Sequence, residues 1–275
     1  MKTLIYCSLF LATLFSAIPA RALDAGDFTR AEYVFTTNES AALDLAPRSL
    51  AGKRAGYYDF INFEPDREEK LVTYLETPDR QFSKRSLIIR VREDLKNPWK
   101  SKITVKLRAP SPGQFGDLKR YKKAEIDIAH DGTKKYSVSY DIKFDPAGID
   151  VRKVDVAAVA ARIKKKSPEA WALAGPVFTE QTGKIRQTIV MRALSWEGRL
   201  TKAPDRVEVD YAIWSPYYKY PGQFISELSY KISTSNKDRE RPARQIHEAL
   251  MQKGILSDSP ASKTKATFKM SPDFN

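Results

Sequence analysis

The chain has 275 residues, with 47 Lys and Arg against 34 Asp and Glu, and a single cysteine. One cysteine excludes a disulfide framework, so the fold must be stabilised by its hydrophobic core. The formal charge of +13 favours an anionic partner, such as polyphosphate, a nucleotide, nucleic acid, a cell-wall polymer or an anionic membrane surface, without choosing among them. The alternative is that the excess of Lys and Arg only keeps the protein soluble and serves no specific ligand.

Residues 1–22 have the pattern of an export signal. Lys2 supplies a positive start, residues 4–18 are mostly apolar, and Ala20-Arg21-Ala22 has the small-x-small form of a cleavage site. We expect cleavage near Ala22 and a secreted or periplasmic protein. Its formal charge is +11, because Lys2 and Arg21 are lost. Cys7 lies inside this segment, and no later run reaches the roughly 20 apolar residues that a membrane-spanning helix needs.

Alternating apolar and polar residues predict eight strands, enough for one large sheet or barrel. The Asp131-Gly132 pair has the chemistry of a hairpin turn and predicts that residues 124–144 form one hairpin. In chain order, the expected strands are residues 32–36, 87–92, 102–108, 124–128, 136–144, 184–191, 206–211 and 224–232.

Three helices are expected between and after these strands. Residues 154–166 are rich in alanine and end on three lysines, and Ser167-Pro168 begins a second, short helix that reaches Gly175. Residues 239–253 carry an apolar stripe, and Gly254 ends that helix. Residues 109–116 and 215–222 are predicted loops, and the tail 257–275 is polar and partly loose.

Two neighbouring strands carry cations at alternate positions. The two-residue period places Arg90 and Arg92 on one face of their strand, and it places Lys106 and Arg108 on one face of the next. An antiparallel sheet with one solvent-exposed face would also alternate apolar and charged residues, but solvent-exposed faces usually mix charges of both signs. Like charges on adjacent strands repel each other unless an anion or carboxylates offset them. The pattern therefore indicates a polyanion site, for which the planar fork of Arg is well suited.

Carboxylates recur in the same way on other strands. Glu125 and Asp127 share one face, Glu208 and Asp210 share another, and Glu227 lies on the face that carries Lys231. A closed barrel whose polar side chains point inward accommodates all of them. Its cations would hold phosphates while its carboxylates held a hydrated Mg²⁺ or Mn²⁺ ion.

Several motifs occur in a fixed order along the chain. They are Tyr74-Leu75-Glu76-Thr77-Pro78-Asp79, Arg90-Val91-Arg92, Thr104-Val105-Lys106, Glu125-Ile126-Asp127, Pro176-Val177-Phe178 with Lys184 and Arg186, Glu208, Ile225-Ser226-Glu227-Leu228 and Ser262-Lys263. In this order they resemble the CYTH domain, the family of triphosphate tunnel metalloenzymes. The resemblance covers almost the whole chain after residue 22.

The resemblance implies an α+β fold, mostly antiparallel β, in which an eight-stranded closed tunnel has flanking helices. It implies a single domain over residues 23–256 and a tail, 257–275, that returns to the tunnel near Lys263. The ligand would be a triphosphate, polyphosphate or nucleotide, with hydrolysis or transfer at phosphorus supported by Mg²⁺ or Mn²⁺. The substrate-binding residues it implies are Arg90, Arg92, Lys106, Arg186, Lys184 and Lys263, and the metal ligands are Glu32, Glu125, Glu208 and Glu227.

The sequence departs from the family in its acidic positions. The family's first strand reads Glu-x-Glu-x-Lys, whereas Glu32-Tyr33-Val34-Phe35-Thr36 keeps only one of these residues. Fewer carboxylates weaken a divalent-cation site, because charge count sets affinity for hard cations. Anion binding is therefore expected while hydrolysis stays open. The alternative function is a non-catalytic polyanion-binding or structural envelope protein with the same fold.

Other chemistries have weaker support. His130 falls in a predicted turn and His247 on the last predicted helix, and the chain after residue 22 has no cysteine, which disfavours a zinc site. No Gly-rich phosphate loop, nucleophile elbow or specific nucleic-acid motif is present. Tyr217-Tyr218-Lys219-Tyr220 could stack on bases or sugars, but such clusters more often pack a loop against a barrel.

Overall fold

The structure is a computed structural model that describes residues 23–38, 53–116, 118, 120–201, 207–218 and 224–274. The expected export signal lies outside the described residues. Among those described, ten strands form one sheet, which closes on itself because β3 pairs with both β4 and β2. The strands are β1 (Arg30–Thr37), β2 (Ile61–Glu76), β3 (Leu87–Asp94), β4 (Lys102–Ala109), β5 (Lys123–Ala129), β6 (Lys134–Lys143), β7 (Arg186–Gln187), β8 (Met191–Leu200), β9 (Glu208–Pro216) and β10 (Ile225–Ser233).

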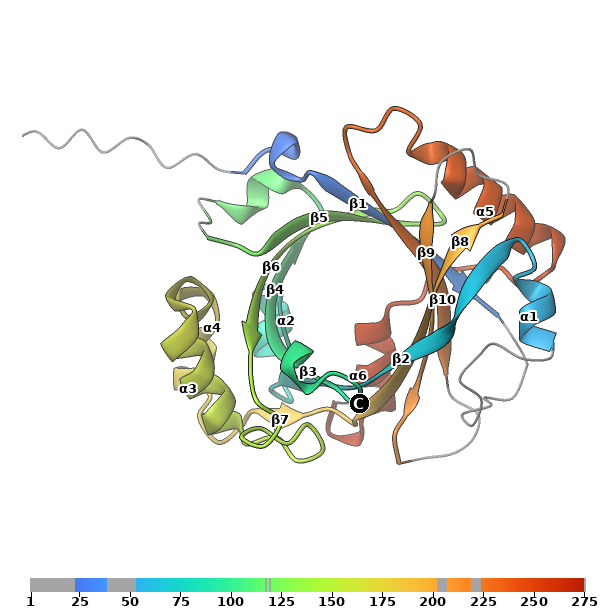
Figure 1. Cartoon of the computed structure of the whole chain (residues 1–275). Coiled ribbons are helices and arrows are strands. Elements are labelled where there is room, and N and C mark those ends of the chain that lie inside the picture. Colours follow the sequence, from blue (N-terminus) through green and yellow to red (C-terminus); the bar gives the residue numbers. More distant parts are fainter. Residues whose placement is uncertain are drawn as a thin grey trace, which may run out of the picture.

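Nine of these strands form the wall of a tunnel, in the order β3, β4, β6, β5, β1, β10, β9, β8 and β2 (Figure 1). The short β7 pairs only with the end of β2, outside the ring. All neighbours are antiparallel except β1 and β5, which are parallel. The expected closed, mostly antiparallel tunnel is confirmed, and its wall has nine described strands where the resemblance implied eight.

The helices cover the tunnel from outside on two sides. Figure 1 shows α3 and α4 beside the wall that contains β4 and β6, and α5 on the opposite side of the ring. Apolar residues from the outer faces of β3, β4 and β6 form one core with α3 and α4, and those of β1, β9 and β10 form another with α5. The helices are α1 (Lys53–Tyr57), α2 (Gln81–Lys84), α3 (Val156–Lys166), α4 (Pro168–Glu180), α5 (Glu240–Gln252) and α6 (Lys263–Met270), with 3₁₀ turns at Ala25–Asp27, Pro98–Lys100, Pro112–Phe115 and Pro272–Phe274.

Several sequence-based expectations need correction. Residues 184–191 are not one strand but a turn, the two residues of β7 and the start of β8. Strands β2 and β8 were not expected, because charged residues interrupt the alternation in both. Helix α4 also continues through Gly175 and Pro176 to Glu180. A Cβ on Gly175 would lie 2.7 Å from the ring of Trp171, so this glycine makes room for the ring within the helix and does not end the helix.

The tail is more ordered than its polar composition suggested. Residues 263–270 form α6, whose N-cap Ser262 accepts a hydrogen bond from the amide of Lys265. Phe268 and Phe274 are buried in a third apolar cluster with tunnel-facing residues such as Trp214. In Figure 1, α6 accordingly lies within the outline of the ring, beside β2. The tail thus closes part of the tunnel from inside.

None of the described helices has the length and hydropathy that crossing a membrane would require.

Candidate functional site: a basic cavity in the tunnel

Strand register decides which residues face the tunnel. Arg90 is opposite Tyr74 on one neighbouring strand and Thr104 on the other, and residues directly opposite each other share a face. Leu87, Ile89 and Val91, which alternate with the arginines, are buried in the outer core against the helices. The cationic face predicted from the two-residue period is therefore the inner face.

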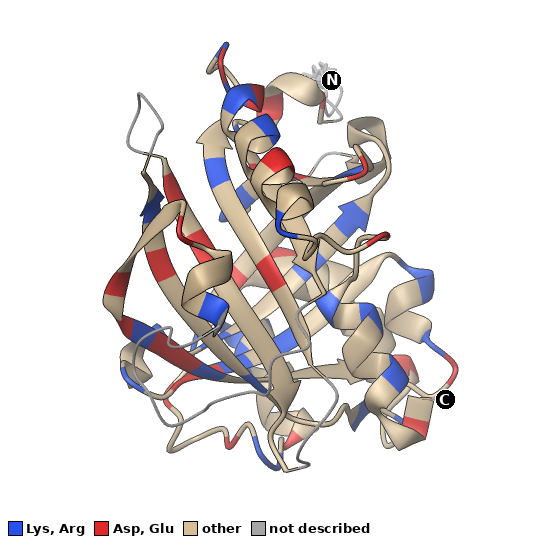
Figure 2. Cartoon of the chain, turned by 90° about the vertical axis from the view of Figure 1, so that its right-hand side faces the viewer, with Lys and Arg blue, Asp and Glu red and all other residues tan. Residues whose placement is uncertain are grey.

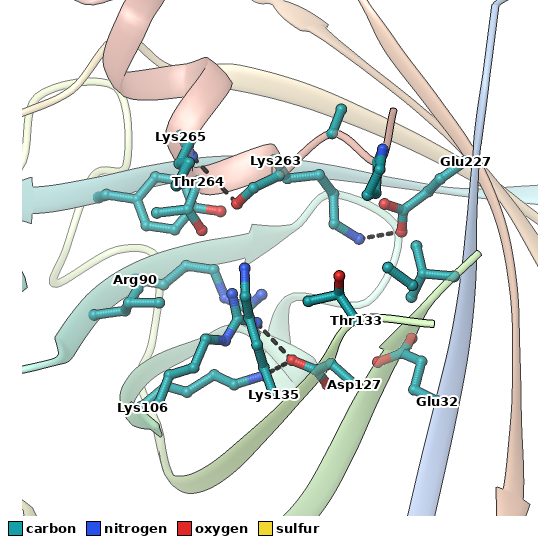
Figure 3. A pocket seen from close by; sticks show the side chains of 18 of the residues that line it. Glu32, Arg90, Lys106, Asp127, Thr133, Lys135, Glu227, Lys263, Thr264 and Lys265 are labelled. Atoms are coloured by element: carbon teal, nitrogen blue, oxygen red, sulfur yellow. Dashed lines mark hydrogen bonds and ion pairs between the residues drawn. The ribbon is translucent and has the colours of Figure 1, made fainter. Parts of the chain in front are cut away.

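A cavity of about 240 Å³ lies inside this tunnel. Figure 3 shows side chains from distant parts of the chain that point into it. Five of the residues singled out in the sequence meet around it, each from a different element: Glu32 on β1, Arg90 on β3, Lys106 on β4, Glu227 on β10 and Lys263 on α6. These segments are up to 231 positions apart in the sequence, so only the closed sheet and the returning tail bring them together.

The other five residues singled out in the sequence lie elsewhere. Arg92 and Glu125 are on tunnel-facing positions but do not line the cavity. Glu208 is exposed and lies opposite Arg199 on β8. Lys184 and Arg186 are exposed beyond the ring, in the turn before β7 and on β7, where Arg186 donates hydrogen bonds to the carbonyls of residues 183 and 185.

The cavity also contains charged residues that the sequence reading did not select for the site. Arg108 and Asp127 line it, and both were within reach of the sequence pattern, since each follows a selected residue by two positions. Lys135 and Lys265 line it as well. Lys265 gave no usable signal, because the resemblance in the tail covered only Ser262-Lys263 and no strand alternation continues from there.

Part of this charge is compensated within the tunnel. Asp127 accepts from Lys106 at 3.3 Å and from Arg108 at 2.6 Å. Farther along β4, Lys102 contacts Asp141 at 2.5 Å. Burial lowers the pKa of Lys106, while Asp127 opposes that shift. The carboxylates thus hold some of the cations in place.

Arg90 and Arg92 are the exception. Among the described residues, neither has an ion pair within 4 Å, and the Nε atom of each is buried without a hydrogen-bond partner. Burial first, and the charge of Arg90 second, lower the pKa of Arg92 to about 10. Buried donors without partners cost free energy, so this pair of guanidinium groups is suited to an incoming acceptor.

The carboxylates of the cavity lie next to lysines. Glu227 is paired with Lys263, as Figure 3 shows, and Lys231 lies 3.4 Å from Glu32 and 3.9 Å from Asp210. Burial by itself would raise the pKa of Glu32, but Lys231 and Lys263 hold it below its ordinary value of 4.5. Both carboxylates are therefore already paired with a lysine.

This donor set does not fit a divalent metal. Within the described part of the chain, no three His, Cys, Asp or Glu side chains come together as a group that could hold an ion. The inward positions that follow Glu32 on β1 are Val34 and Thr36, so the strand offers one carboxylate. Because Mg²⁺ is held through carboxylates in a demanding octahedral shell, the arrangement lacks what such a site requires.

Acidic residues are also concentrated away from the cavity. Figure 2, which faces the right-hand side of Figure 1, shows them recurring along the strands at the left of its view. On this side, Asp210 of β9 lies opposite Glu197 of β8. Burial raises the pKa of both, and their mutual repulsion raises that of Glu197 further. The tunnel wall is thus basic around β3 and β4 and acidic around β8 and β9.

The Glu-Thr-Pro-Asp motif has a structural role. Glu76, 1 % exposed, accepts hydrogen bonds from the amides of Thr77, Phe82 and Ser83 and from the Ser83 hydroxyl, at 2.6–2.9 Å. It thereby fixes the turn and α2 between β2 and β3. Arg80 in this turn donates to the Phe274 carbonyl at 2.7 Å, which attaches the tail to the motif.

One solved structure supports the fold. No family model and no curated protein matches the sequence. A solved structure from Hippeastrum, described as a candidate adenylyl cyclase with a dominant triphosphatase activity, matches with a TM-score of 0.50 and 10 % identity over 90 % of this chain and 99 % of that chain. A candidate adenylate cyclase from Bacillus halodurans matches with a TM-score of 0.40 and 14 % identity over 79 % of this chain and 92 % of that one. At 10 % identity, the Hippeastrum likeness shows a shared fold alone.

Proposed function

We propose that the tunnel binds a phosphate-rich anion. The observation that carries this proposal is the position of Arg90, which lines a cavity with a buried Nε donor that has no partner. Six cations and three carboxylates line the same cavity, an excess of three positive charges: Arg90, Lys106, Arg108, Lys135, Lys263 and Lys265 against Glu32, Asp127 and Glu227. Phosphate oxygens match both the charge and the fork of the guanidinium.

The size of the cavity favours a short inorganic anion over a nucleotide. Its volume of about 240 Å³ is below the roughly 300–1,000 Å³ that is usual for sites of drug-sized ligands. A base and sugar would have to extend out of it. Tripolyphosphate is therefore the ligand we propose first, with nucleoside triphosphates and longer polyphosphate as weaker candidates.

Titration calorimetry tests this proposal. Tripolyphosphate should bind the protein that lacks residues 1–22, and its affinity should fall as salt rises, because the site is screened. Inorganic sulfate at the same ionic strength serves as the control for general charge attraction and should bind much more weakly. If tripolyphosphate gives no heat at low salt, or binds no better than sulfate, the proposed function is wrong.

Hydrolysis of triphosphate is the second candidate. It is supported by the fold shared with the Hippeastrum protein, which is described as having a dominant triphosphatase activity. On this basis we also infer that the chain is a divergent relative of the CYTH group. Release of phosphate from tripolyphosphate, measured with and without Mg²⁺ or Mn²⁺, distinguishes an enzyme from the non-catalytic binding protein that is the alternative.

Export stays a proposal supported by residues 1–22 alone. Mass measurement of the mature protein from the medium or periplasm checks it, and an intact N-terminus there would contradict it.

A further inference from the structure

We propose that this tunnel binds its anion without a divalent metal, that Lys263 supplies positive charge between the carboxylates and the anion, and that Lys231 compensates Glu32 from outside the cavity lining. The inference rests on the proposed anion binding and concerns how that binding is achieved. It accounts for the mismatch between the carboxylates of the tunnel and the requirements of a metal site.

Lys263 is held in the tunnel by the tail. It is the first residue of α6, and the amide of Ala261 just before it donates to Thr36 on β1 at 2.9 Å. Its ammonium is paired with Glu227 and lies 5.2 Å from the centre of the Trp214 ring. Both contacts favour the charged form, and although burial lowers its pKa, Glu227 and Glu32 raise it above the ordinary value. The ammonium is thus a fixed cation of the cavity.

Lys231 compensates the other carboxylate, but its exposed side chain does not line the cavity. It is directly opposite Glu32 in the pairing of β1 with β10, so both side chains lie on the inner face. The pKa of Lys231 is raised, first by Glu32 and then, against the effect of burial, by Asp210. Because β10 lies between β1 and β9, Lys231 contacts Glu32 on one neighbouring strand and Asp210 on the other.

The Glu32–Lys231 and Glu227–Lys263 pairs are neutral without an added ion. Glu32 and Glu227 contribute two negative charges, and Lys231 and Lys263 contribute two positive ones. A divalent cation between these carboxylates would have to displace an ammonium from each, and Asp127, the third carboxylate of the cavity, is already paired with Lys106 and Arg108. Mg²⁺ carries several waters and dehydrates reluctantly, so it gains little from such an exchange. The lysines therefore neutralise the carboxylates that a metal would otherwise neutralise, and Arg90 remains available to bind the anion.

Calorimetry with inorganic tripolyphosphate in EDTA, and again with Mg²⁺ or Mn²⁺ at matched ionic strength, tests this inference. We expect Kd values that agree within about twofold, after correction for the metal that the free anion itself binds. Mn²⁺ alone, followed by its electron paramagnetic resonance signal, should not bind the protein. Binding that disappears in EDTA and returns with metal would overturn the inference while supporting the proposed function. Absence of binding in both conditions would refute the proposed function itself.

Substitutions give an independent test. Lys263→Met should weaken binding in EDTA at least tenfold, Lys263→Arg should retain most of it, and Lys269→Met, an exposed position on the same helix, should leave it unchanged. Lys231→Met repeats the test from β10 in case the α6 variant loses its docking. Wild-type affinity in EDTA for both Met variants would overturn the assignment.

Discussion

Arg90→Met should weaken anion binding and, at the same time, stabilise the ligand-free protein. Arg90 and Arg92 are two residues apart on one face of β3, which places their Cα atoms about 7 Å apart. Two like charges at that separation repel by about 2 kcal/mol at an effective dielectric constant of 20 and by about 0.6 kcal/mol in water. Methionine keeps the straight side chain and removes one charge together with its buried, unpaired Nε.

The two effects have different magnitudes. Relief of the repulsion by about 1 kcal/mol should raise the Tm by about 2 to 4 °C for a chain of this size. Loss of a charged donor to phosphate should cost about 1.5 to 3 kcal/mol of binding free energy, which corresponds to an affinity about 10 to 150 times weaker.

Thermal unfolding followed by circular dichroism and titration with tripolyphosphate measure both effects on the same samples. Arg186→Met is the matched control, because the sequence suggested Arg186 for the same role while the structure places it beyond the ring. Its affinity should equal that of the wild type. A folded Arg90→Met protein with wild-type affinity, or a Tm that falls by more than about 5 °C, would refute this view of the cavity.

Three further predictions concern stability and the tail. The pKa of Glu32 is held below 4.5, so its charge contributes stability above pH 4.5 that is lost as the pH falls through its folded-state pKa. Glu32→Gln should therefore flatten the fall of the Tm below pH 4.5, and an unchanged fall would contradict this. Glu76→Gln should lower the free energy of unfolding by about 2 to 4 kcal/mol in urea titrations, because one acceptor oxygen becomes a donor that faces other donors; a loss below about 0.5 kcal/mol would refute the structural role. Phe268→Ala removes a ring packed against the tunnel, at a usual cost of about 3 to 5 kcal/mol. It should make residues 257–274 sensitive to trypsin and weaken tripolyphosphate binding, because Lys263 is released. Trypsin resistance equal to that of the wild type would argue against docking of the tail.

Local sequence patterns predicted much of the tunnel wall. The expected strand at residues 102–108 agrees within one residue with β4 (Lys102–Ala109), and the Asp131-Gly132 hairpin is present, with Gly132 at φ +85°. These succeeded because alternation and turn chemistry are properties of a few adjacent residues. Strand β2 escaped prediction because residues 64–70 read Glu-Pro-Asp-Arg-Glu-Glu-Lys, which places charged residues on both faces and leaves no apolar alternation.

The candidate site was predicted only in part for a related reason. Arg90 and Lys106 were found because each belongs to a strand whose own alternation fixes its face. Arg186 could not be separated from them, because the sequence does not reveal that β7 pairs with the end of β2 outside the ring. Lys265 was missed because its place depends on the docking of α6, which rests on packing of Phe268 and Phe274 against distant strands.

The sequence by itself determined which side chains share a face, that two adjacent strands carry like charges at alternate positions, and that the first strand keeps only one of the family's carboxylates. Only the tertiary structure decided that this face is the inner one and that Lys231 and Lys263 compensate Glu32 and Glu227. The physical reason is the range of the interactions. A side-chain face follows from the local two-residue period, whereas closure of the tunnel and return of the tail depend on pairing and packing between residues far apart in the chain.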